Sequence, residues 1–396
     1  MAGTLTAPPT RRPAIAGLGI TDMGRIYGRD AEDFAAEAVR LAVADAGLRL
    51  GDVDGLLTNT GLSGGVGLGL QRRLQLRDLR VLSEIQSYGA SAGAMVSYAS
   101  MAVQAGMAET IVCVFADAPL QEGRRSSAAY AGRRAPQGFD ALLPASGLTS
   151  VNALYAVAAR RHMETYGTTS EQLGAISVAQ RQWAAMNPRA QLRDPITLGD
   201  HQSSRWIAEP LRLLDCCLVS NGGVAVVVTT AERAAHLPKP PVHVRGWAQS
   251  HPGYPETRDS TFGLESGAAE SGPAALKMAG LSISDVTVAE LYDCYTFTAL
   301  LSLEDYGFCD KGEGGPFAAS GALAPGGGRL AVNTGGGQLS SYYMWGMTPL
   351  SEAVIQARGE GGERQAPAND VILVSGNGGI LDHHSTLVLS PHADND

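Results

Sequence analysis

The stretch Ala46-Gly-Leu-Arg-Leu-Gly-Asp-Val53 recurs later in the chain as Ala279-Gly-Leu-Ser-Ile-Ser-Asp-Val286. The two copies are 279 − 46 = 233 residues apart throughout. Each copy follows a helix-like pattern and precedes a strand-like one. A repeat of such a long period, in a unit that alternates strand and helix, indicates duplication of a βαβ unit rather than a solenoid. The chain is therefore predicted to contain two similar α/β halves.

The patterns around the repeat predict the elements of each half. A helix through about Ala46 is expected to open at Asp30 or Asp33, since acidic residues favour helix starts. In the first half we expect strands at 13–20, 52–58, 109–115 and 218–229 and a helix of small residues at about 88–105. In the second half we expect strands at 242–248, 288–291 and 371–375, a helix at 266–279, and a loop-and-helix after Asn333.

A proline-rich hinge, Leu237-Pro-Lys-Pro-Pro241, separates the halves, which we place at 1–237 and 241–396. Within the first half, the regular alternation of strand and helix is lost between about 118 and 204. We interpret this segment as an insertion that carries substrate contacts. It is predicted to contain a charged loop at 121–134 and helices at 149–166 and 170–186.

Composition limits the function classes. The 396 residues carry a net charge of −9 with no basic block, which disfavours nucleic-acid binding. Five cysteines, an odd number without CxxC spacing, indicate reduced thiols rather than a disulfide framework or a zinc site. The N-terminal MAGTLTAPPTRRP has no apolar signal core, and no segment reaches transmembrane length. We expect a soluble, cytoplasmic protein.

The second copy of the repeat leads into Val288–Cys309, where an apolar run breaks into a polar cluster and then resumes with helical spacing. The cluster is Tyr292-Asp293-Cys294-Tyr295-Thr296. A strand that runs straight into a helix puts the joining residues at the carboxyl edge of a sheet, where ligands bind in open α/β folds. The cluster is therefore a candidate catalytic corner. The alternative is that its tyrosines are half-buried packing residues.

Three motifs place this chain beside a known family. They are LYDCYTFTALLSLEDYGFCDKGEGGPF, NTGGGQLSSYYMWGM and HQSSRWIAEPLRLLDCC. Together with the duplicated halves they resemble the lipid-transfer-protein branch of the thiolase superfamily. That branch includes thiolase-like aldolases that release the side chain of steroid acyl-CoA esters. The resemblance covers essentially the whole chain and implies a thiolase fold, an α/β architecture layered αβαβα.

The departures from true thiolases define the expected chemistry. The position of the thiolase nucleophilic Cys falls on Gly89 or Ala90. The Asn-Glu-Ala-Phe motif is replaced by Tyr292-Asp-Cys-Tyr295, the Gly-His-Pro motif by Tyr342-Tyr-Met344, and the C-terminal Cys-x-Gly-Gly-Gly by Ser375-Gly-Asn-Gly-Gly379. A retro-aldol cleavage needs no acyl-enzyme. It needs a base, an acid and an enolate holder, and phenols can serve as the first two. The resemblance implies Tyr292 and Tyr343 in those roles, meeting across the boundary between the halves, without assigning which is which.

Other residues are secondary candidates, each with an alternative. Asp293 either orients a tyrosine or caps the following helix. Cys294 is either a second nucleophile or, as we favour, a packed thiol. His384 either tunes the site or is an ordinary strand residue beside His383. Glu304 and Asp305 are expected on a solvated helix face.

The remaining candidates concern binding. Backbone amides of the glycine loops are reasonable holders of the thioester or enolate. We expect Ser91 to lie near the substrate, whereas its role as a nucleophile is disfavoured because no base accompanies it. The loop arginines either meet coenzyme A phosphates or, as we favour, only face solvent. The glycines are Gly336, Gly337, Gly378 and Gly379, and the arginines are Arg124, Arg125, Arg133 and Arg134.

The function that the resemblance implies is an acyl-CoA aldolase, a carbon–carbon lyase, which cleaves a β-hydroxyacyl-CoA to a ketone and a short acyl-CoA such as propionyl-CoA. The alternatives are a thiolase or acyltransferase that uses an unrecognised residue, and a non-catalytic scaffold subunit. No metal or separate cofactor is expected, because coenzyme A enters as part of the substrate. The resemblance also implies a homodimer that joins a small OB-fold, zinc-ribbon partner in a heterotetramer.

Overall fold

The computed structural model describes residues 11–126, 129, 137–328 and 330–393. Its strands are β1 Pro13–Ile20, β2 Gly55–Thr60, β3 Val81–Glu84, β4 Thr110–Asp117, β5 Trp206–Ala208, β6 Leu211–Arg212, β7 Gly222–Thr230, β8 Val242–Ser250, β9 Val288–Glu290, β10 Ala331–Val332, β11 Ile372–Gly378 and β12 His383–Ser390. Its α-helices are α1 Ala31–Asp45, α2 Leu70–Leu74, α3 Ser91–Gln104, α4 Leu142–Ala145, α5 Val151–Tyr166, α6 Ser170–Ala185, α7 Leu198–Ser203, α8 Ala231–Ala234, α9 Ala268–Ala279, α10 Thr296–Asp305, α11 Gly314–Ala319 and α12 Met347–Ala357.

The main sheet is internally symmetric. Its strand order is β10-β9-β11-β12-β8-β1-β7-β4-β2-β3. Read from either edge, the order is the same when β1 is matched with β8, β2 with β9, β3 with β10, β4 with β11 and β7 with β12. In both halves the second strand is parallel to its two neighbours. The halves join where β1 and β8 pair at Ala14↔His243 and Ile15↔Val242. The exact division of the chain at 237–241 stays a prediction.

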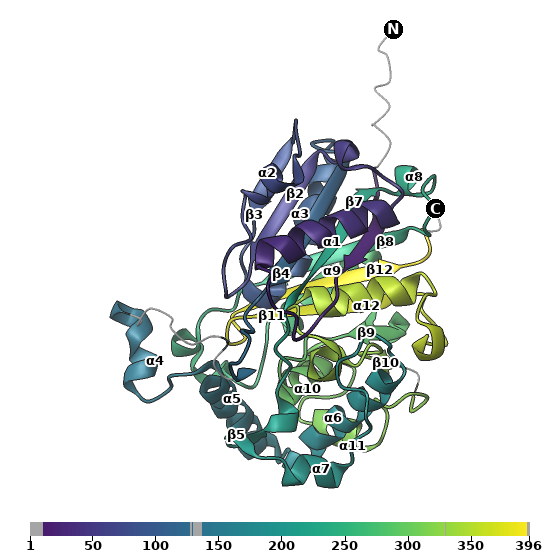
Figure 1. Cartoon of the computed structure of the whole chain (residues 1–396). Coiled ribbons are helices and arrows are strands. Elements are labelled where there is room, and N and C mark those ends of the chain that lie inside the picture. Colours follow the sequence, from purple (N-terminus) through teal and green to yellow (C-terminus); the bar gives the residue numbers. More distant parts are fainter. Residues whose placement is uncertain (1–10, 127–128, 130–136, 329, 394–396) are drawn as a thin grey trace.

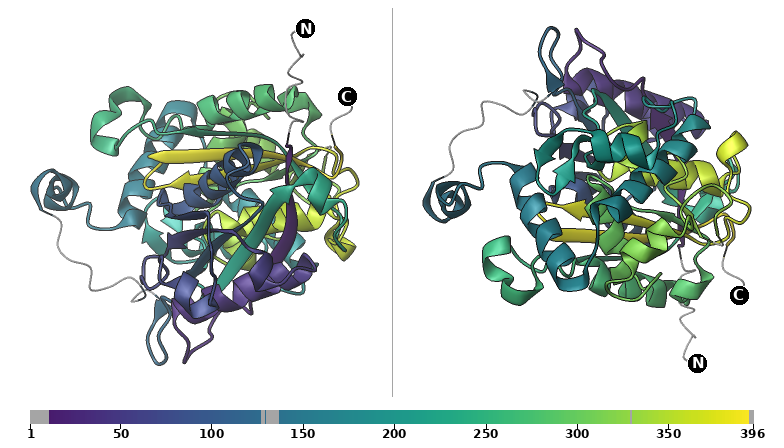
Figure 2. Two further views of the ribbon diagram at one scale, coloured as in Figure 1. Left: turned by 90° about the horizontal axis from the view of Figure 1, so that it is seen from above. Right: turned by 90° about the horizontal axis from the view of Figure 1, so that it is seen from below.

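Helices form three layers around these strands. The small-residue helix α3 lies in the middle, since it contacts β4 and β7 of the first half and β11 and β12 of the second. The helix α12 shares this layer and packs on β9 and β11. On the outside, α1 covers β1, β4 and β7, whereas α9 covers β8 and β12. Figure 2 shows, from above, the strands running between α9 (green) and the purple helices. The layers are αβαβα, as the resemblance implied.

Most predicted elements of the scaffold are confirmed. The residue before α1, Asp30, is its N-cap, and the Asp30 carboxylate accepts from the backbone N–H of Asp33 at 2.7 Å. The Asp33 carboxylate in turn accepts from the backbone N–H of Asp30 at 3.2 Å. This reciprocal capping box satisfies two amides that have no partner within the helix. The repeated octapeptides form equivalent turns, because each contains a short 3₁₀ helix, Leu50–Asp52 in one and Ile283–Asp285 in the other. The two octapeptides thus match in structure as well as in amino-acid sequence.

The insertion contains the two helices predicted for it, α5 and α6. They lie below the sheet in Figure 1 together with α7, α10 and α11. The helix α6 contacts α7, α10 and α11, so the insertion covers the side on which β9 ends and α10 begins. Arg124 and Arg125 of the charged loop are exposed, whereas Arg133 and Arg134 lie outside the described residues.

The HQSSRWIAEPLRLLDCC motif joins the insertion to α10. The buried His201 Nε2 lies 2.8 Å from Asp215 Oδ1. The same oxygen accepts from the hydroxyl of Thr296, in the first turn of α10, at 2.6 Å. A buried carboxylate is stable only when its lone pairs are used, and these contacts use them. The motif therefore fixes the start of α10 at Thr296, the last residue of the Tyr292–Thr296 cluster.

The loop and helix expected after Asn333 are present, and a π-helical turn at Gly337–Ser341 separates the glycines from α12, which begins at Met347. One expectation about local structure is wrong. Glu304 and Asp305 do not face solvent, because their side chains are 0% and 1% exposed. Tertiary partners explain this error, since Glu304 accepts from Gly314 N at 3.0 Å and Asp305 from Ser266 N at 2.7 Å.

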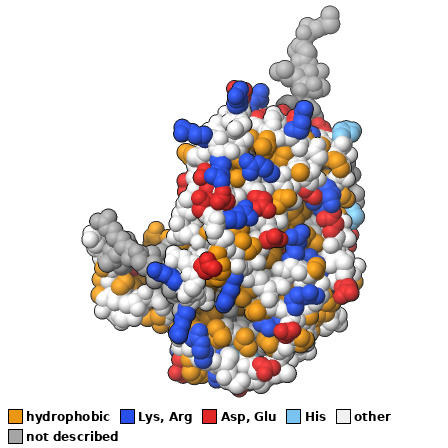
Figure 3. Space-filling model, in the orientation of Figure 1, with side chains coloured by type: hydrophobic (Ala, Val, Ile, Leu, Met, Phe, Trp, Pro, Cys, Tyr) orange, Lys and Arg blue, Asp and Glu red, His pale blue; other side chains and the backbone are white. Residues whose placement is uncertain are grey.

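The surface carries mixed charge. On the face drawn in Figure 3, Lys and Arg side chains are interspersed with Asp and Glu, and no continuous basic stripe crosses it. Among the residues that the structure describes, no helix has the length and apolar character needed to span a bilayer.

Candidate active site

Tyr292 and Tyr343 face one another. Tyr292 lies two residues after the end of β9 and is 3% exposed, and Tyr343 is half-buried in the stretch between the π-helical turn and α12. Their hydroxyl oxygens are 3.3 Å apart, within hydrogen-bond range. Both residues belong to the second half, so the expectation that the pair spans the two halves is wrong. The first half instead contributes the wall against which the Tyr292 ring packs.

That wall is Gly89, at the head of α3. A β-carbon built on Gly89 would lie 2.3 Å from two carbons of the Tyr292 ring and 2.1 Å from the carbonyl oxygen of Asn377. A β-carbon on Gly346 would lie 2.4 Å from the carbonyl oxygen of Gly89. Three segments therefore meet at distances that only glycine allows. One of the two positions at which we expected the thiolase nucleophile is filled by the phenol ring of Tyr292.

Asp293 ties the two tyrosine segments together. Its carboxylate accepts from Gln338 N at 2.8 and 3.0 Å and from Leu339 N at 3.2 Å. These amides belong to the π-helical turn that leads to Tyr343, not to α10, so of the two alternatives for Asp293 the cap of the following helix is wrong. Burial raises the pKa of Asp293 to about 7, with the backbone hydrogen bonds acting in the opposite direction. Asp293, which follows Tyr292 in the chain, thus holds the loop that leads to Tyr343.

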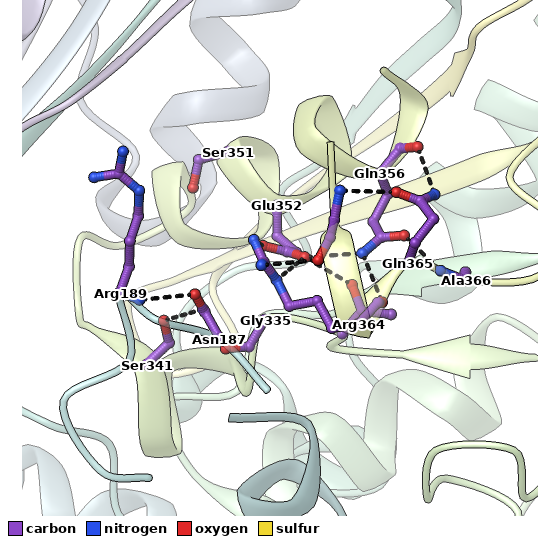
Figure 4. A network of polar contacts seen from close by, with 12 residues as sticks. Asn187, Arg189, Gly335, Ser341, Ser351, Glu352, Gln356, Arg364, Gln365 and Ala366 are labelled. Atoms are coloured by element: carbon purple, nitrogen blue, oxygen red, sulfur yellow. Dashed lines mark hydrogen bonds and ion pairs between the residues drawn. The ribbon is translucent and has the colours of Figure 1, made fainter. Parts of the chain in front are cut away.

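A network of buried polar contacts supports the same loop (Figure 4). Asn187, just beyond α6, donates to Gly335 O at 2.8 Å and to Ser341 Oγ at 3.2 Å. Arg364 binds both carboxylate oxygens of Glu352, at 2.9 and 3.1 Å. The loop approaches this pair closely, since a β-carbon on Gly335 would lie 2.8 Å from Glu352 Oε2. The backbone before Tyr343 is therefore held from two sides.

A second buried acid belongs to this network. Thr334 donates to Glu290 Oε1 at 2.7 Å and lies 3.1 Å from Glu352 Oε1. Burial, and next the charge of Glu352, raise the pKa of Glu290 well above its ordinary value. Glu290, Asp293 and Glu352 line a cavity of about 10 Å³, roughly the space that one water needs. Burial and the neighbouring carboxylate therefore both favour the protonated form of Glu290 beside the Glu352–Arg364 ion pair.

Cys294 is in the environment of a packed thiol. It is 5% exposed, and its sulfur lies 3.8 Å from Thr298 Oγ1. Burial raises the pKa of the thiol to about 12. A nucleophilic cysteine needs the opposite shift, because the thiolate is the reactive form.

His384 lies in the core rather than against the tyrosine pair. Its Nε2 is 2.9 Å from the hydroxyl of Tyr306 and 3.3 Å from Ser375 Oγ. Burial lowers the pKa of His384 to about 3, so the ring is neutral at working pH. These contacts give it a structural place on β12, with the half-buried His383 beside it on the strand.

The predicted binding positions are tightly packed. The N–H of Gly336 donates to Asn333 O at 2.8 Å. A β-carbon on Gly337 would lie 2.1 Å from Asp293 Oδ2, and one on Gly378 1.9 Å from Ser87 O. The Gly379 carbonyl accepts from a tyrosine described below, and Ser91 Oγ accepts from Ser87 N at 2.7 Å. The Gly336 amide and the Ser91 hydroxyl are therefore already engaged within the fold.

The sequence patterns missed Tyr155 as a site residue. Its hydroxyl, on helix α5 of the insertion, lies 2.8 Å from Gly379 O and 2.9 Å from Asn377 Nδ2. Its ring lies 4.6 Å from that of Tyr295, centroid to centroid. Burial raises the pKa of Tyr155 well above 10. No local motif marks this residue, because its partners are about 140 or more positions away in the chain.

Among the described residues, no group of three or more His, Cys, Asp or Glu could hold a metal ion.

A duplicated, layered α/β fold, in which two phenols meet at the head of the central helix, defines a thiolase-fold enzyme built without the thiolase cysteine at that point. The comparisons agree. The family model "Thiolase C-terminal domain-like" matches residues 246–391. A steroid side-chain-cleaving aldolase of Thermomonospora curvata is 41% identical over 92% of this chain and 95% of its own. A 17-hydroxy-3-oxo-4-pregnene-20-carboxyl-CoA lyase of Mycobacterium tuberculosis is 40% identical over 92% of this chain and 96% of its own.

A solved structure described as the Ltp2-ChsH2(DUF35) aldolase superposes with a TM-score of 0.85 and 38% identity, covering 96% of this chain and 98% of that chain. The chain therefore belongs to the thiolase superfamily, in its family of thiolase-like aldolases, and is a carbon–carbon lyase.

Proposed function

We propose that this chain cleaves a β-hydroxyacyl-CoA by a retro-aldol reaction, with Tyr292 and Tyr343 as the acid–base pair. The products are a ketone and a short acyl-CoA such as propionyl-CoA. One observation carries the assignment of residues: the two hydroxyl groups lie 3.3 Å apart, at the head of the helix where a thiolase would hold its nucleophile. Cys294, the thiol of the same cluster, supports this assignment indirectly because burial raises its pKa to about 12.

The reaction balances with two phenols alone. One tyrosine, as phenolate, takes the proton of the β-hydroxyl. The oxygen electrons form the ketone carbonyl, the Cα–Cβ bond breaks, and its electron pair passes to the α-carbon as the thioester enolate. The other tyrosine then gives its proton to the α-carbon. General acid and base groups of this kind each contribute about 10² to 10⁴ in rate.

The contact between the hydroxyls has two further consequences. After one turnover the base has become a phenol and the acid a phenolate, so a proton passing between them across 3.3 Å restores the starting state. Before turnover, the phenol that keeps its proton donates it to the phenolate oxygen. A hydrogen bond to the charged form stabilises that form, and we propose that this contact is what lets one of the two tyrosines act as the base. The order of the roles is left open.

The names of the relatives support the substrate class. One is a steroid side-chain-cleaving aldolase and another a lyase of a hydroxylated pregnene carboxyl-CoA. We therefore propose a steroid-type acyl-CoA as substrate. Coenzyme A takes part only as the thioester of that substrate, and no further cofactor is required. Backbone amides near Gly337 and Gly376–Gly379 are proposed to hold the enolate.

We propose that two copies of this chain form a homodimer at the centre of the assembly. The solved relative contains a second component, ChsH2(DUF35), and we propose that this chain also works with a small partner, built as an OB fold with a zinc-ribbon element. Co-purification of the two chains and the mass of the complex test this. A monomeric chain that is fully active alone would contradict it.

The reaction is tested by supplying two substrates to the purified chain, with and without the partner. A β-hydroxyacyl-CoA should release a ketone and a shorter acyl-CoA without added free coenzyme A. A β-ketoacyl-CoA with free coenzyme A should not be cleaved. Cleavage of the second substrate alone would replace the proposal with a thiolase reaction. If neither is cleaved with the partner present, the chain is a scaffold subunit.

A further inference from the structure

We propose that Asn377 is a substrate-binding residue whose side-chain oxygen accepts a hydrogen bond from a donor of the acyl-CoA near its thioester. The inference rests on the proposed function for the identity of the ligand. It arises from a buried acceptor whose orientation is fixed and whose partner is missing among the described residues.

The orientation of the Asn377 amide follows from its neighbour Tyr155. The phenol of Tyr155 has one hydrogen, and its oxygen lies 2.8 Å from the carbonyl of Gly379. A carbonyl oxygen can only accept, so Tyr155 donates its hydrogen there. The Asn377 atom at 2.9 Å from the same phenol oxygen must then be the donor, which is Nδ2. The Oδ1 atom consequently points away from Tyr155.

That oxygen is buried without a donor. Asn377 is 3% exposed, and its Oδ1 has no hydrogen-bond partner within the described part of the chain. Leaving a buried polar atom unsatisfied is unfavourable by about 1–3 kcal/mol, and such atoms are rare enough to need an explanation. Rotation of the amide does not remove the problem, because it would break the contact with Tyr155. An external donor does remove it.

Asn377 also lies beside the reacting groups. Its backbone oxygen would be 2.1 Å from a β-carbon on Gly89, the same point that lies 2.3 Å from the Tyr292 ring. The ring of its partner Tyr155 packs at a tilt against the ring of Tyr295, which directly follows Cys294 in the polar cluster. A ligand whose reacting carbons lie beside the Tyr292 and Tyr343 hydroxyls therefore brings its thioester region close to Asn377.

An acyl-CoA has two donors near the thioester. One is the β-hydroxyl of a β-hydroxyacyl-CoA, whose single proton can be donated to Asn377 only before the tyrosine base takes it, and the other is the first amide N–H of the pantetheine arm. Both are neutral donors that suit an amide oxygen, so they share one binding chemistry. Analogues that lack one donor at a time distinguish them: a deoxy ligand without the β-hydroxyl, and an ester analogue with oxygen in place of the pantetheine N–H.

The test measures equilibrium dissociation constants of the three ligands in the Tyr343→Phe background, so that nothing is cleaved. We expect Asn377→Ala to bind the complete ligand about tenfold more weakly. The analogue that lacks the accepted donor should bind the parent background about tenfold more weakly too, and Asn377→Ala should weaken its binding no further. Asn377→Asp, which keeps an acceptor, should retain most of the affinity. Asn369→Ala, which removes an amide donor to Gln356 O, is the matched control.

Two results would overturn the proposal. One is unchanged affinity of Asn377→Ala for the complete ligand. The other is an equal loss for all three ligands, because that pattern means Asn377 acts only by holding Tyr155. Thermal unfolding of each variant checks that the fold persists. The binding assay needs no turnover, so it can fail while the parent chain still releases ketone, and it can succeed if the proposed cleavage is wrong.

Discussion

The ring of Tyr292 occupies the space that a side chain on residue 89 would need. A β-carbon at Gly89 would meet two ring carbons at 2.3 Å, a distance that real β-carbons do not adopt. Two departures from the thiolase pattern, the loss of the nucleophile and the gain of a tyrosine, are thus one change: only one of the two groups fits. The geometry therefore excludes a cysteine at residue 89, one of the two expected nucleophile positions, while the Tyr292 ring keeps its place.

Replacing Gly89 with Cys should therefore not create a thiolase. The new side chain collides with the Tyr292 ring and with Asn377 O, and overpacking of this kind destabilises by about 1–3 kcal/mol. We expect a lower unfolding temperature, weakened ketone release and no thiolysis of a β-ketoacyl-CoA. Gly51→Ala is the control, because nothing lies within 4 Å of its added β-carbon. Coenzyme A-dependent cleavage by Gly89→Cys would contradict the steric argument.

Removing either hydroxyl of the pair should stop the reaction without unfolding the chain. Tyr292→Phe and Tyr343→Phe each keep the ring and lose the proton-transfer atom, so kcat should fall by about 10²-fold to 10⁴-fold. Ketone release measures this, and Tyr254→Phe, at a residue 59% exposed, serves as the control. If both variants keep near-full activity, the two-phenol mechanism is wrong.

Asp293 should give stability a pH dependence. Burial raises its folded-state pKa to about 7 from an ordinary value of 3.8. Between about pH 4 and 7 the folded chain holds a proton that the unfolded chain has lost. The free energy of unfolding should therefore fall as pH rises through this window, by at most about 1.4 kcal/mol per pH unit. The contribution is complete below pH 4 and lost above 7.

Asp293→Asn cannot titrate, so its unfolding free energy should lack this component of the slope. Chemical denaturation of both proteins from pH 4 to 8 gives the comparison. Parallel curves for the two proteins would show that Asp293 is not a raised carboxyl. Because the variant also changes the acceptor for Gln338 N and Leu339 N, we further expect its kcat to fall as the Tyr343 loop loosens.

Removing one partner of the buried ion pair Glu352–Arg364 should lower the free energy of unfolding, chiefly because the other charge is left buried without a partner. Arg364→Met strands Glu352 next to the buried Glu290, and removing one partner of such a pair destabilises by about 3–5 kcal/mol. Adding Glu352→Gln in the same chain should recover part of the loss. The exposed pair Lys239–Glu360, which is 37% and 36% exposed, is the control and should contribute about 0–1 kcal/mol. Equal losses from both pairs in denaturation would contradict this.

Prediction from the sequence succeeded where the signal is local. The helix start at Asp30, the position of each repeated octapeptide between a helix and a strand, and the two helices of the insertion are all predicted from patterns in neighbouring residues or from the repeat itself. Burial failed where partners come from afar. Glu304 and Asp305 are charged residues of the kind found on exposed helix faces. They are nevertheless buried, because the backbone N–H groups of Gly314 and Ser266 donate hydrogen bonds to their carboxylates.

The sequence by itself determined the duplicated α/β scaffold and the two tyrosines, because periodicity and motif replacement are written in the order of residues. Only the tertiary structure decided which groups meet. It brought the Tyr292 ring onto Gly89, turned Asp293 from a helix cap into a support for the Tyr343 loop, and set Asn377 against Tyr155. These contacts join segments separated by 45 to more than 200 positions, and packing between layers, rather than local preference, fixes them.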